Sequence, residues 1–347
     1  MTELTELLST PPLGQGLREP LRQALDGKAK PVGALGRIED LALTLGLIQQ
    51  TLRPTVTQPV LLVFAGDHGL TRSGVAAYPS GVTVAMVDTL LTGRASANAF
   101  AGVVGAEVQV IDAGVAADLS DRAGLIQAKV ASGTKDASVE PAMTRDQAEA
   151  ALLEGAAMAR AAIDEGADVI ALGEMGIGNS ASAALLMHRL APAPLADCVG
   201  QGAGHSPEGM ARKQAVLARA AARSGATAPM EVLTQFGGFE IAMMAGALLG
   251  AAKAGVPVVV DGFIGSAAAL LAIRLAPNAR GYCIFAHASA EAGHRRMLQA
   301  VEAQPLLGLD MRLGEGTGAL LAVPLLKAAC ALLSDVAELK DILEAAR

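Results

Sequence analysis

The segment VLLVFAGDHG, at residues 60–69, runs from an unbroken apolar stretch into Gly, Asp and His. Later segments repeat this form, namely VQVIDAG (108–114), DVIALGE (168–174), VPVVVDG (256–262) and YCIFAHA (282–288). Ala-rich stretches with helical spacing separate them. Strands that are apolar throughout and alternate with helices form parallel sheets covered on both faces. The sequence therefore predicts an α/β fold with a parallel sheet.

Polar or glycine-rich clusters follow the predicted strands. They are GDHG (66–69), DAG (112–114), GE (173–174), DG (261–262) and His287. In open parallel sheets the ligand crevice lies outside the carboxyl ends of the strands. We therefore expect these clusters to converge on one site.

The composition excludes several classes of protein. The 347 residues are 52% hydrophobic but 2% aromatic, with no Trp, so the interior has to be built from Ala, Leu, Val and Gly. The net charge of −7 disfavours a nucleic-acid-binding protein, which needs a basic face and stacking side chains. Cys198, Cys283 and Cys330 are far apart in apolar contexts, so they form no disulfide framework and no CxxC motif. We expect buried thiols in a reducing compartment.

The N-terminus and the longest apolar run bear on location. The opening MTELTELLSTPPLGQ has acids and prolines where a secretion signal has a basic start and an apolar run, which predicts a cytoplasmic protein. The best candidate span, residues 241–252, ends at Lys253, although about 18 uninterrupted apolar residues are needed to cross a bilayer. The sequence predicts no transmembrane segment and leaves peripheral association open.

Both ends of the chain are predicted to be helical. Residues 1–58 have helical apolar spacing, and at the other end TGALLAVPLLKAACALL (317–333) contains Pro324, which is expected to kink or break it. We predict that residues 1–58 and 325–347 form a small helical domain. Residues 59–324 then form a large α/β domain that carries the active site.

Glycine-rich loops are the candidates for ligand binding. LGEGTG (313–318) presents Glu315 between glycines that let a ligand approach closely, although a solvated glutamate at a helix start has the same pattern. GEMGIGNS (173–180) opens a helix with Asn179 or Ser180 as the expected cap, and exposed amides there suit an anion. GQGAG (200–204) precedes a helix capped by Ser206 that contains Lys213, which together suggest a phosphate cradle.

Other catalytic motifs are missing from the sequence. There is no P-loop, no GxSxG elbow and no zinc-ligand spacing among the histidines, and the glycine order GxxGxG is a poor match to a dinucleotide fingerprint. His68 and His287, at strand ends, are the histidines placed to touch a ligand.

Taken together, these segments resemble the nicotinate-nucleotide:dimethylbenzimidazole phosphoribosyltransferase family of the cobalamin pathway. The resemblance covers nearly the whole chain in order, and its stretches are long. They are KPVGALGRIEDLA (30–42), FAGDHGLTRSGVAAYPSGVT (64–83), ALGEMGIGNSASAALL (171–186), VGQGAGHSPEGMARKQAV (199–216), GGFEIAMMAGALLGAAKAGVPVVVDGFIGSAAALLA (237–272), HASAEAGH (287–294) and LGEGTGALLAVPLL (313–326).

The resemblance implies a fold and an activity. The fold is a Rossmann-like large domain with a small helical domain, assembled as a homodimer. The enzyme would move the 5-phosphoribosyl group from nicotinate mononucleotide to a nitrogen of 5,6-dimethylbenzimidazole, releasing nicotinate and giving α-ribazole 5'-phosphate. No metal or redox cofactor is implied.

The resemblance also implies roles for individual residues. The carboxylate of LGEGTG, Glu315, would be the catalytic base, with Glu174 as a second carboxylate near the base or ribose. The acceptor base would lie among Ser80, Met86, Met175 and Leu313. Asp261 would suit a ribose hydroxyl, and the phosphate and ribose would be bound by Gly176, Gly202, Lys213, Gly265 and Ser266.

The sequence leaves alternatives open. The acceptor could be adenine, another benzimidazole or a phenolic base, because Gly81, near the expected base pocket, departs from the family pattern. A nucleotide-binding protein without turnover is a second alternative, against which Glu315 argues. A diphosphate-activated phosphoribosyltransferase would show paired acids at a strand end, whereas VVVDGF (258–263) has a single Asp.

Overall fold

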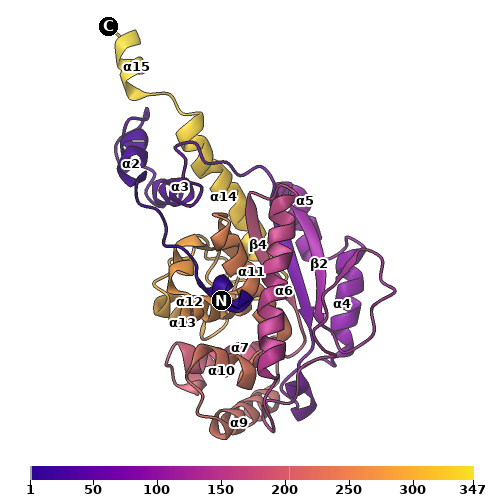
Figure 1. Ribbon diagram of the computed structural model, residues 1–347. Helices are drawn as coiled ribbons and strands as arrows, with labels where there is room; N and C mark the ends of the chain where they lie inside the picture. The colour runs from indigo at the N-terminus through magenta and orange to yellow at the C-terminus, as the bar shows by residue number, and fades with distance from the viewer. Residues whose placement is uncertain (1, 203) are drawn as a thin grey trace.

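The computed structural model describes residues 2–202 and 204–347, which are built around one sheet of six parallel strands (Figure 1). The strand order is β3-β2-β1-β4-β5-β6, the Rossmann order. The strands are β1 (Pro59–Gly66), β2 (Glu107–Gly114), β3 (Leu125–Gln127), β4 (Val169–Met175), β5 (Val258–Val260) and β6 (Cys283–Phe285). The predicted α/β fold with a parallel sheet is confirmed.

Each of the predicted apolar segments contains a strand, and one strand was missed. β3 is three residues long, LIQ, and pairs in parallel with the end of β2. Only Leu125 of β3 is buried, so this edge strand lacks the continuous apolar run that marks the other strands. From β1 the chain first builds the sheet outward on one side, through β2 and β3. It then crosses to the other side of β1 and continues with β4, β5 and β6, so the strand order reverses direction between β1 and β4. Ligands bind at this reversal in folds of this kind.

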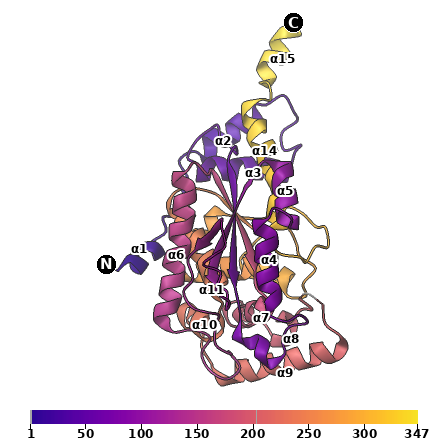
Figure 2. The same ribbon diagram turned by 90° about the vertical axis from the view of Figure 1, so that its right-hand side faces the viewer.

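Helices cover both faces of the sheet, as Figure 2 shows edge-on. β1 is buried along its whole length, and its alternate side chains serve two cores. Leu62 and Phe64 belong to the core under α6 (Arg145–Asp164) and α11 (Phe239–Lys253). Leu61 and Val63 belong to the core under α4 (Gly81–Leu91), α5 (Ser96–Val104) and α14 (Thr317–Ser334). A strand buried on both faces explains why the sequence shows no alternation there.

The Ala- and Gly-rich composition allows close helix packing. A Cβ atom added to Gly155 of α6 would lie 2.0 Å from the carbonyl oxygen of Met243, and one added to Gly246 of α11 would lie 1.9 Å from that of Leu152. Any side chain at either position would therefore separate the two helices. Small residues take the place that aromatic side chains fill in other cores.

The remaining helices connect the strands or lie at the ends. They are α1 (Glu3–Leu8), α2 (Arg18–Asp26), α3 (Arg37–Ile48), α7 (Asn179–Leu190), α8 (Leu195–Cys198), α9 (Pro207–Arg223), α10 (Pro229–Phe236), α12 (Phe263–Leu275), α13 (His294–Ala300) and α15 (Leu339–Ala345), with 3-10 turns η1 (Gly69–Ser73) and η2 (Pro277–Tyr282).

The two ends of the chain meet beside the sheet. α2 and α3 pack against α14 at one end of the molecule, and α15 extends beyond them (Figure 1). α1 lies elsewhere, against α6 and α11. The division into a small and a large domain stays a prediction.

Of the two expectations for Pro324, a kink or a break, the break does not occur in α14. It is one helix from Thr317 to Ser334 with Pro324 inside, so the proline does not divide it into two. By length and composition α14 is the one described helix that could span a membrane, although 61% of its 18-residue window is buried in the protein. Its apolar side chains pack on the sheet. The three cysteines are free and buried, as predicted.

Candidate active site

A cavity of about 270 Å³ opens at the carboxyl ends of β4, β5 and β6. Glu174, at the end of β4, and Asp261 and His287, after β5 and β6, line it, which confirms part of the predicted convergence. The clusters after β1 and β2 do not line it. His68 instead lies buried, with its Nε2 atom 2.6 Å from Glu240 Oε1. Burial lowers the pKa of His68, but Glu240 and Asp67 outweigh this effect and raise the pKa above its usual value. The expectation that all five clusters share one site is therefore wrong for 66–69 and 112–114.

Glu315 is buried against the cavity wall, with one oxygen held by the chain. Its Oε2 atom accepts a hydrogen bond of 3.1 Å from the backbone N–H of Ala97, at the start of α5. Burial raises the pKa of Glu315 above its usual value; the Ala97 N–H acts against this and the nearby Asp261 carboxylate adds to it. Glu315 is 3% exposed. A desolvated carboxylate with a raised pKa is a stronger base than one in water.

The backbone around Glu315 explains its glycines. Gly314, Glu315 and Gly316 have φ values of 96°, 61° and 82°, all in the left-handed region. This turn lies directly on β4, since a Cβ atom on Gly173 would be 2.6 Å from the carbonyl oxygen of Glu315. Glycines before and after Glu315, and a glycine facing it on β4, thus set the position of the carboxylate.

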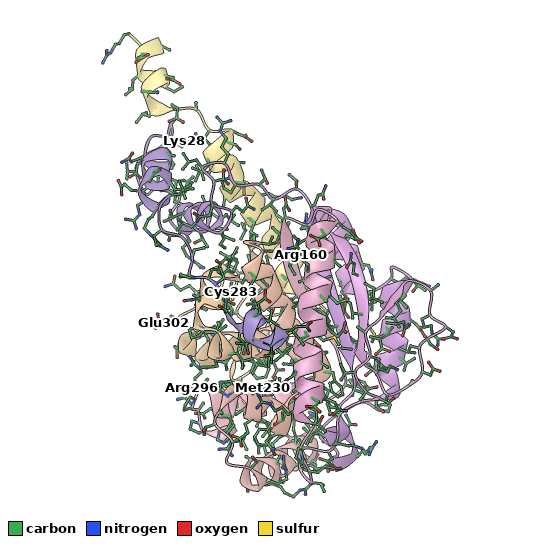
Figure 3. All side chains as sticks on the ribbon, in the orientation of Figure 1. Lys28, Arg160, Met230, Cys283, Arg296 and Glu302 are labelled. Atoms are coloured by element: carbon green, nitrogen blue, oxygen red, sulfur yellow. The ribbon has the colours of Figure 1, made fainter. Side chains whose placement is uncertain are left out.

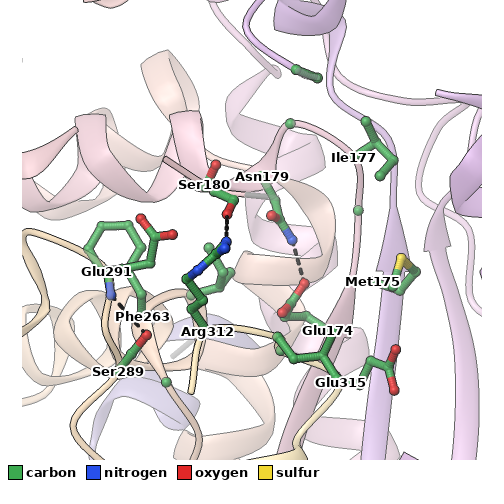
Figure 4. Close-up of a pocket in the computed structure, with 18 of the residues that line it drawn as sticks. Glu174, Met175, Ile177, Asn179, Ser180, Phe263, Ser289, Glu291, Arg312 and Glu315 are labelled. Atoms are coloured by element: carbon green, nitrogen blue, oxygen red, sulfur yellow. Dashed lines mark hydrogen bonds between the residues drawn. The ribbon is translucent and has the colours of Figure 1, made fainter. Parts of the chain in front are cut away.

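Glu174 lies at the end of β4 in the same cavity. Burial is the main reason that the pKa of Glu174 rises to about 8, and the carboxylates of Asp261, Glu240 and Glu315 raise it further. The Asn179 amide, which donates to Oε2, lowers this pKa. Figure 4 shows the Asn179–Glu174 bond between the two sides of the cavity. At neutral pH Glu174 is therefore mainly protonated.

Asp261 connects the cavity to the start of α14. Its Oδ1 atom accepts from the N–H of Ala319 at 3.0 Å and lies 3.4 Å from Nε2 of His287. A Cβ atom on Gly318 would lie 2.7 Å from the same oxygen, so α14 can approach Asp261 only with a glycine there.

The wall near Glu315 is apolar. Of the predicted base-binding residues, Met86, Met175 and Leu313 line the cavity. Ser80 is exposed at the start of α4 and is not among the lining residues. Tyr78, 53% exposed, stands at this wall, and Leu313 is 58% exposed. The apolar lining is completed by Val75, Ala76, Ala77, Val82, Ile177, Phe263 and Ile264.

The opposite side of the cavity is polar. Gly176, Gly202 and Gly265, expected to bind the phosphate and ribose, also line the cavity, together with Ser180, Ser289, Glu291 and Arg312. Arg312 donates to the carbonyl oxygen of Gly202 at 2.8 Å. Within the glycine loop 200–204, Ala203 lies outside the described residues.

Lys213 and Ser266 lie one layer behind this wall. Lys213 is fully buried, and its Nζ donates to Ser180 Oγ at 3.0 Å and to the carbonyl oxygen of Gly200 at 2.9 Å. Burial lowers the pKa of Lys213 to about 8. Ser266 is buried with its Oγ 2.8 Å from Nε2 of His294. Both residues hold the lining residues in place in this structure.

His294 fixes part of the polar wall. It accepts from the N–H of Ser289 at Nδ1, 2.8 Å away, and burial lowers its pKa to about 3. His294 is therefore neutral, and its Nε2–H donates to Ser266. The loop carrying Ser289 is in this way tied to α12.

One predicted helix cap is correct and one is wrong. Ser206 caps α9, accepting from the N–H of Gly209 at 3.2 Å, with Pro207 as the first helical residue. α7 instead begins after Gly178, whose φ is 93°, so Asn179 and Ser180 are already helical. Asn179 is thereby free to bind Glu174 rather than to cap the helix.

Several lining residues were not singled out in the sequence. Arg312 precedes the Glu315 motif directly, and Ser289 and Glu291 belong to HASAEAGH, so their motifs could have drawn attention to them. Tyr78 and His205 likewise lie in quoted stretches, 64–83 and 199–216, but nothing in those stretches showed that these two side chains reach the cavity. No group of three His, Cys, Asp or Glu side chains suited to a metal ion occurs among the described residues.

Known proteins resemble this chain along nearly its whole length. A family model described as phosphoribosyltransferase matches residues 10–342. The nicotinate-nucleotide–dimethylbenzimidazole phosphoribosyltransferase of Cupriavidus necator is 52% identical over 327 residues, 94% of each chain. That of Dechloromonas aromatica is 50% identical over 330 residues, 94% of this chain and 95% of its own. The crystal structure of CobT from Thermus thermophilus has a TM-score of 0.91 and 43% identity, and covers 94% of this chain and 98% of its own.

Proposed function

The chain belongs to the nicotinate-nucleotide:dimethylbenzimidazole phosphoribosyltransferase family, and we propose that its cavity transfers the 5-phosphoribosyl group of nicotinate mononucleotide to 5,6-dimethylbenzimidazole. The products are α-ribazole 5'-phosphate, a component of cobalamin, and nicotinate. The observation that carries this proposal is Glu315, a buried carboxylate fixed beside an apolar wall that suits a flat ring.

Glu315 is the general base. As one ring nitrogen of the benzimidazole attacks the anomeric carbon, the N–H on the other ring nitrogen becomes acidic, and a carboxylate within hydrogen-bond reach removes that proton. The raised pKa of Glu315 brings it closer to neutral pH and so strengthens it as an acceptor. The N–H of Ala97 holds Oε2, which leaves Oε1 for the substrate.

Glu174 and Glu315 divide the protonation states between them. Glu174, with a pKa of about 8, carries a proton at neutral pH and adds no negative charge beside Glu315. A protonated Glu174 thus does not disfavour the anionic form of Glu315, the form that acts as a base. Neighbouring carboxyl groups in different environments can take such separate roles.

The two substrates occupy the two sides of the cavity. The base lies against Met86, Met175 and Leu313, whose apolar side chains fit a ring by shape. The phosphate lies toward Gly176, Gly202 and Gly265, with Lys213 supplying charge from behind, and Asp261 offers Oδ2 to a ribose hydroxyl. Attack from the face opposite the departing nicotinate converts a β nucleotide into an α one, so alignment of two rings about one ribose supplies much of the catalysis.

The enzyme acts as a homodimer in this proposal. None of the residues of α15 is buried, yet Leu339, Ile342 and Leu343 are 38%, 51% and 54% exposed and share one face of the helix. An exposed apolar stripe at the end of the molecule (Figures 1 and 2) suits a contact with a second copy. Sedimentation velocity distinguishes a dimer from a monomer. The free, buried thiols suit the cytoplasm.

A product assay tests the proposal. Purified protein is mixed with nicotinate mononucleotide and 5,6-dimethylbenzimidazole, and products are identified by chromatography and mass spectrometry. We expect nicotinate release coupled to a base-dependent ribotide, and Glu315→Gln is expected to keep the fold and nucleotide binding but to lose most turnover. A Glu315→Gln variant with near-normal turnover would remove Glu315 from the base role. Ribotide formed only with adenine, another benzimidazole or a phenol would change the acceptor.

A further inference from the structure

Glu291 is a carboxylate in the cavity to which the mechanism above gives no role. It lies in the loop after β6, lines the cavity next to Ser289 and is 8% exposed. Figure 4 shows it on the opposite side of the cavity from Glu315 and Met175. Its Oε2 atom is buried and has no hydrogen-bond donor among the described residues.

The neighbouring loop is shaped around this carboxylate. A Cβ atom on Gly200 would lie 1.7 Å from Oε2 of Glu291, so a side chain there would push the carboxylate aside. The backbone N–H of Glu291 donates to Ser289 Oγ at 3.3 Å, which orients the turn. Because Oε2 is packed against Gly200, a ligand in the cavity meets this carboxylate at its other oxygen, Oε1.

The donors that the substrates carry are few. A buried carboxylate without a donor is destabilising, and a bound ligand that supplies one removes the penalty. In nicotinate mononucleotide the phosphate and the nicotinate carboxylate are negative acceptors, which would repel Glu291. The N–H of the benzimidazole is taken by Glu315 in the proposed mechanism. The ribose hydroxyls are the donors that remain.

Asp261 has one oxygen left for the sugar. Its Oδ1 atom already accepts from the N–H of Ala319 and lies near His287, so Asp261 serves one hydroxyl through Oδ2. We infer that Glu291 binds the other ribose hydroxyl of the donor nucleotide, so that the enzyme selects a ribosyl over a deoxyribosyl donor. This inference rests on the proposed function, because it takes the donor to be nicotinate mononucleotide.

A competing role for Glu291 is to keep Lys213 charged. Lys213 Nζ donates to the carbonyl oxygen of Gly200, the residue against which Glu291 lies. In that case a neutral residue at position 291 would weaken binding of every donor that has a phosphate, whatever its sugar. The two roles therefore differ in how the loss depends on the sugar.

The experiment is a binding cycle measured by calorimetry without acceptor base, so that it does not depend on turnover. Wild type and Glu291→Gln are titrated with nicotinate mononucleotide and with its 2'-deoxy and 3'-deoxy forms. Glu302→Gln is the matched control, because Glu302 is exposed and lies on the outer surface (Figure 3). We expect wild type to bind at least one deoxy donor about 10- to 100-fold more weakly than the ribosyl donor, the range for a hydrogen bond to a charged group.

Glu291→Gln is expected to lose affinity for the ribosyl donor by a similar factor and to lose the discrimination against that deoxy donor, whereas Glu302→Gln retains both. Equal losses on all three donors overturn the inference and favour the Lys213 role. In that case Glu291→Gln also begins to lose binding at a lower pH than wild type, because Lys213 loses its proton more readily. Wild type that binds all three donors equally overturns it without any variant. If the product assay fails but wild type still distinguishes ribosyl from deoxyribosyl donors through Glu291, the proposed function is rejected and the inference about Glu291 stands.

Discussion

Gly173→Ala is expected to slow turnover strongly without removing any group that touches substrate. Gly173 lies in β4, and an added Cβ atom would be 2.6 Å from the carbonyl oxygen and 2.9 Å from the carbonyl carbon of Glu315. Both are backbone atoms, so no side chain can turn away to make room. Restoring ordinary contact moves the turn that carries Glu315 by about 1 Å, and a displacement of that size can lower a rate about 100-fold.

The assay separates this effect from a general loss of structure. We expect kcat to fall about 100-fold and the KM for dimethylbenzimidazole to rise, because Leu313 moves with the turn, while the Kd for nicotinate mononucleotide stays within about threefold of wild type. The crowding is also expected to destabilise the fold by about 1–3 kcal/mol, seen as a lower melting temperature.

Gly102→Ala is the matched control for Gly173→Ala. Gly102 is exposed in α5 and has no atom within 4 Å of an added Cβ. Alanine there is expected to leave kcat unchanged and to raise stability by up to about 1 kcal/mol. If Gly173→Ala binds nicotinate mononucleotide normally and turns over within about threefold of wild type, the placement of Glu315 against β4 does not set the rate, and the reasoning fails.

Two further predictions concern the buried ionisable groups. Lys213→Ala is expected to weaken binding of nicotinate mononucleotide about 10- to 100-fold but that of nicotinic acid riboside hardly at all; calorimetry on both ligands checks this, and equal losses would mean that Lys213 does not serve the phosphate. Glu174→Gln is expected to stabilise the protein increasingly as pH rises. Folding raises the pKa of Glu174 from 4.5 to about 8, so wild type loses stability between these values, by on the order of 3 kcal/mol at pH 7. Melting curves from pH 5 to 8 should show that the difference in melting temperature between variant and wild type increases with pH. A difference that does not change with pH would contradict the raised pKa of Glu174.

The sheet could be predicted because its signal is local. A strand buried on both faces has to be apolar throughout, and each of the segments around Val63, Val110, Ile170, Val259 and Ile284 shows this in its own few residues. The order of the strands is not local. It depends on the sides on which α6 and α11 pack, which no single segment of sequence records. β3 was missed because, at the edge of the sheet, it is buried only at Leu125 and so has no continuous apolar run.

The candidate site was predictable at the level of motifs but not of individual contacts. Gly265 and Ser266 are neighbours in DGFIGS, yet Gly265 lines the cavity and Ser266 faces His294, because successive residues of a helix point in different directions. A motif therefore locates a wall of the site without saying which of its side chains reach the ligand.

The same limit explains why the charges at the site were incompletely read from the sequence. Glu174, Asp261 and Glu315 are far apart in the chain. The effect of Asp261 on the pKa values of Glu174 and Glu315 arises because the sheet places β4 beside β5, at the start of α14. Burial then decides how strongly they interact, since a charge shielded from water acts over a longer range. A carboxylate such as Glu291 looks like any exposed glutamate in the sequence. In the folded chain its Oε2 atom packs against Gly200 while the residue lines the cavity, and that position makes an ordinary residue a candidate for recognition of the sugar.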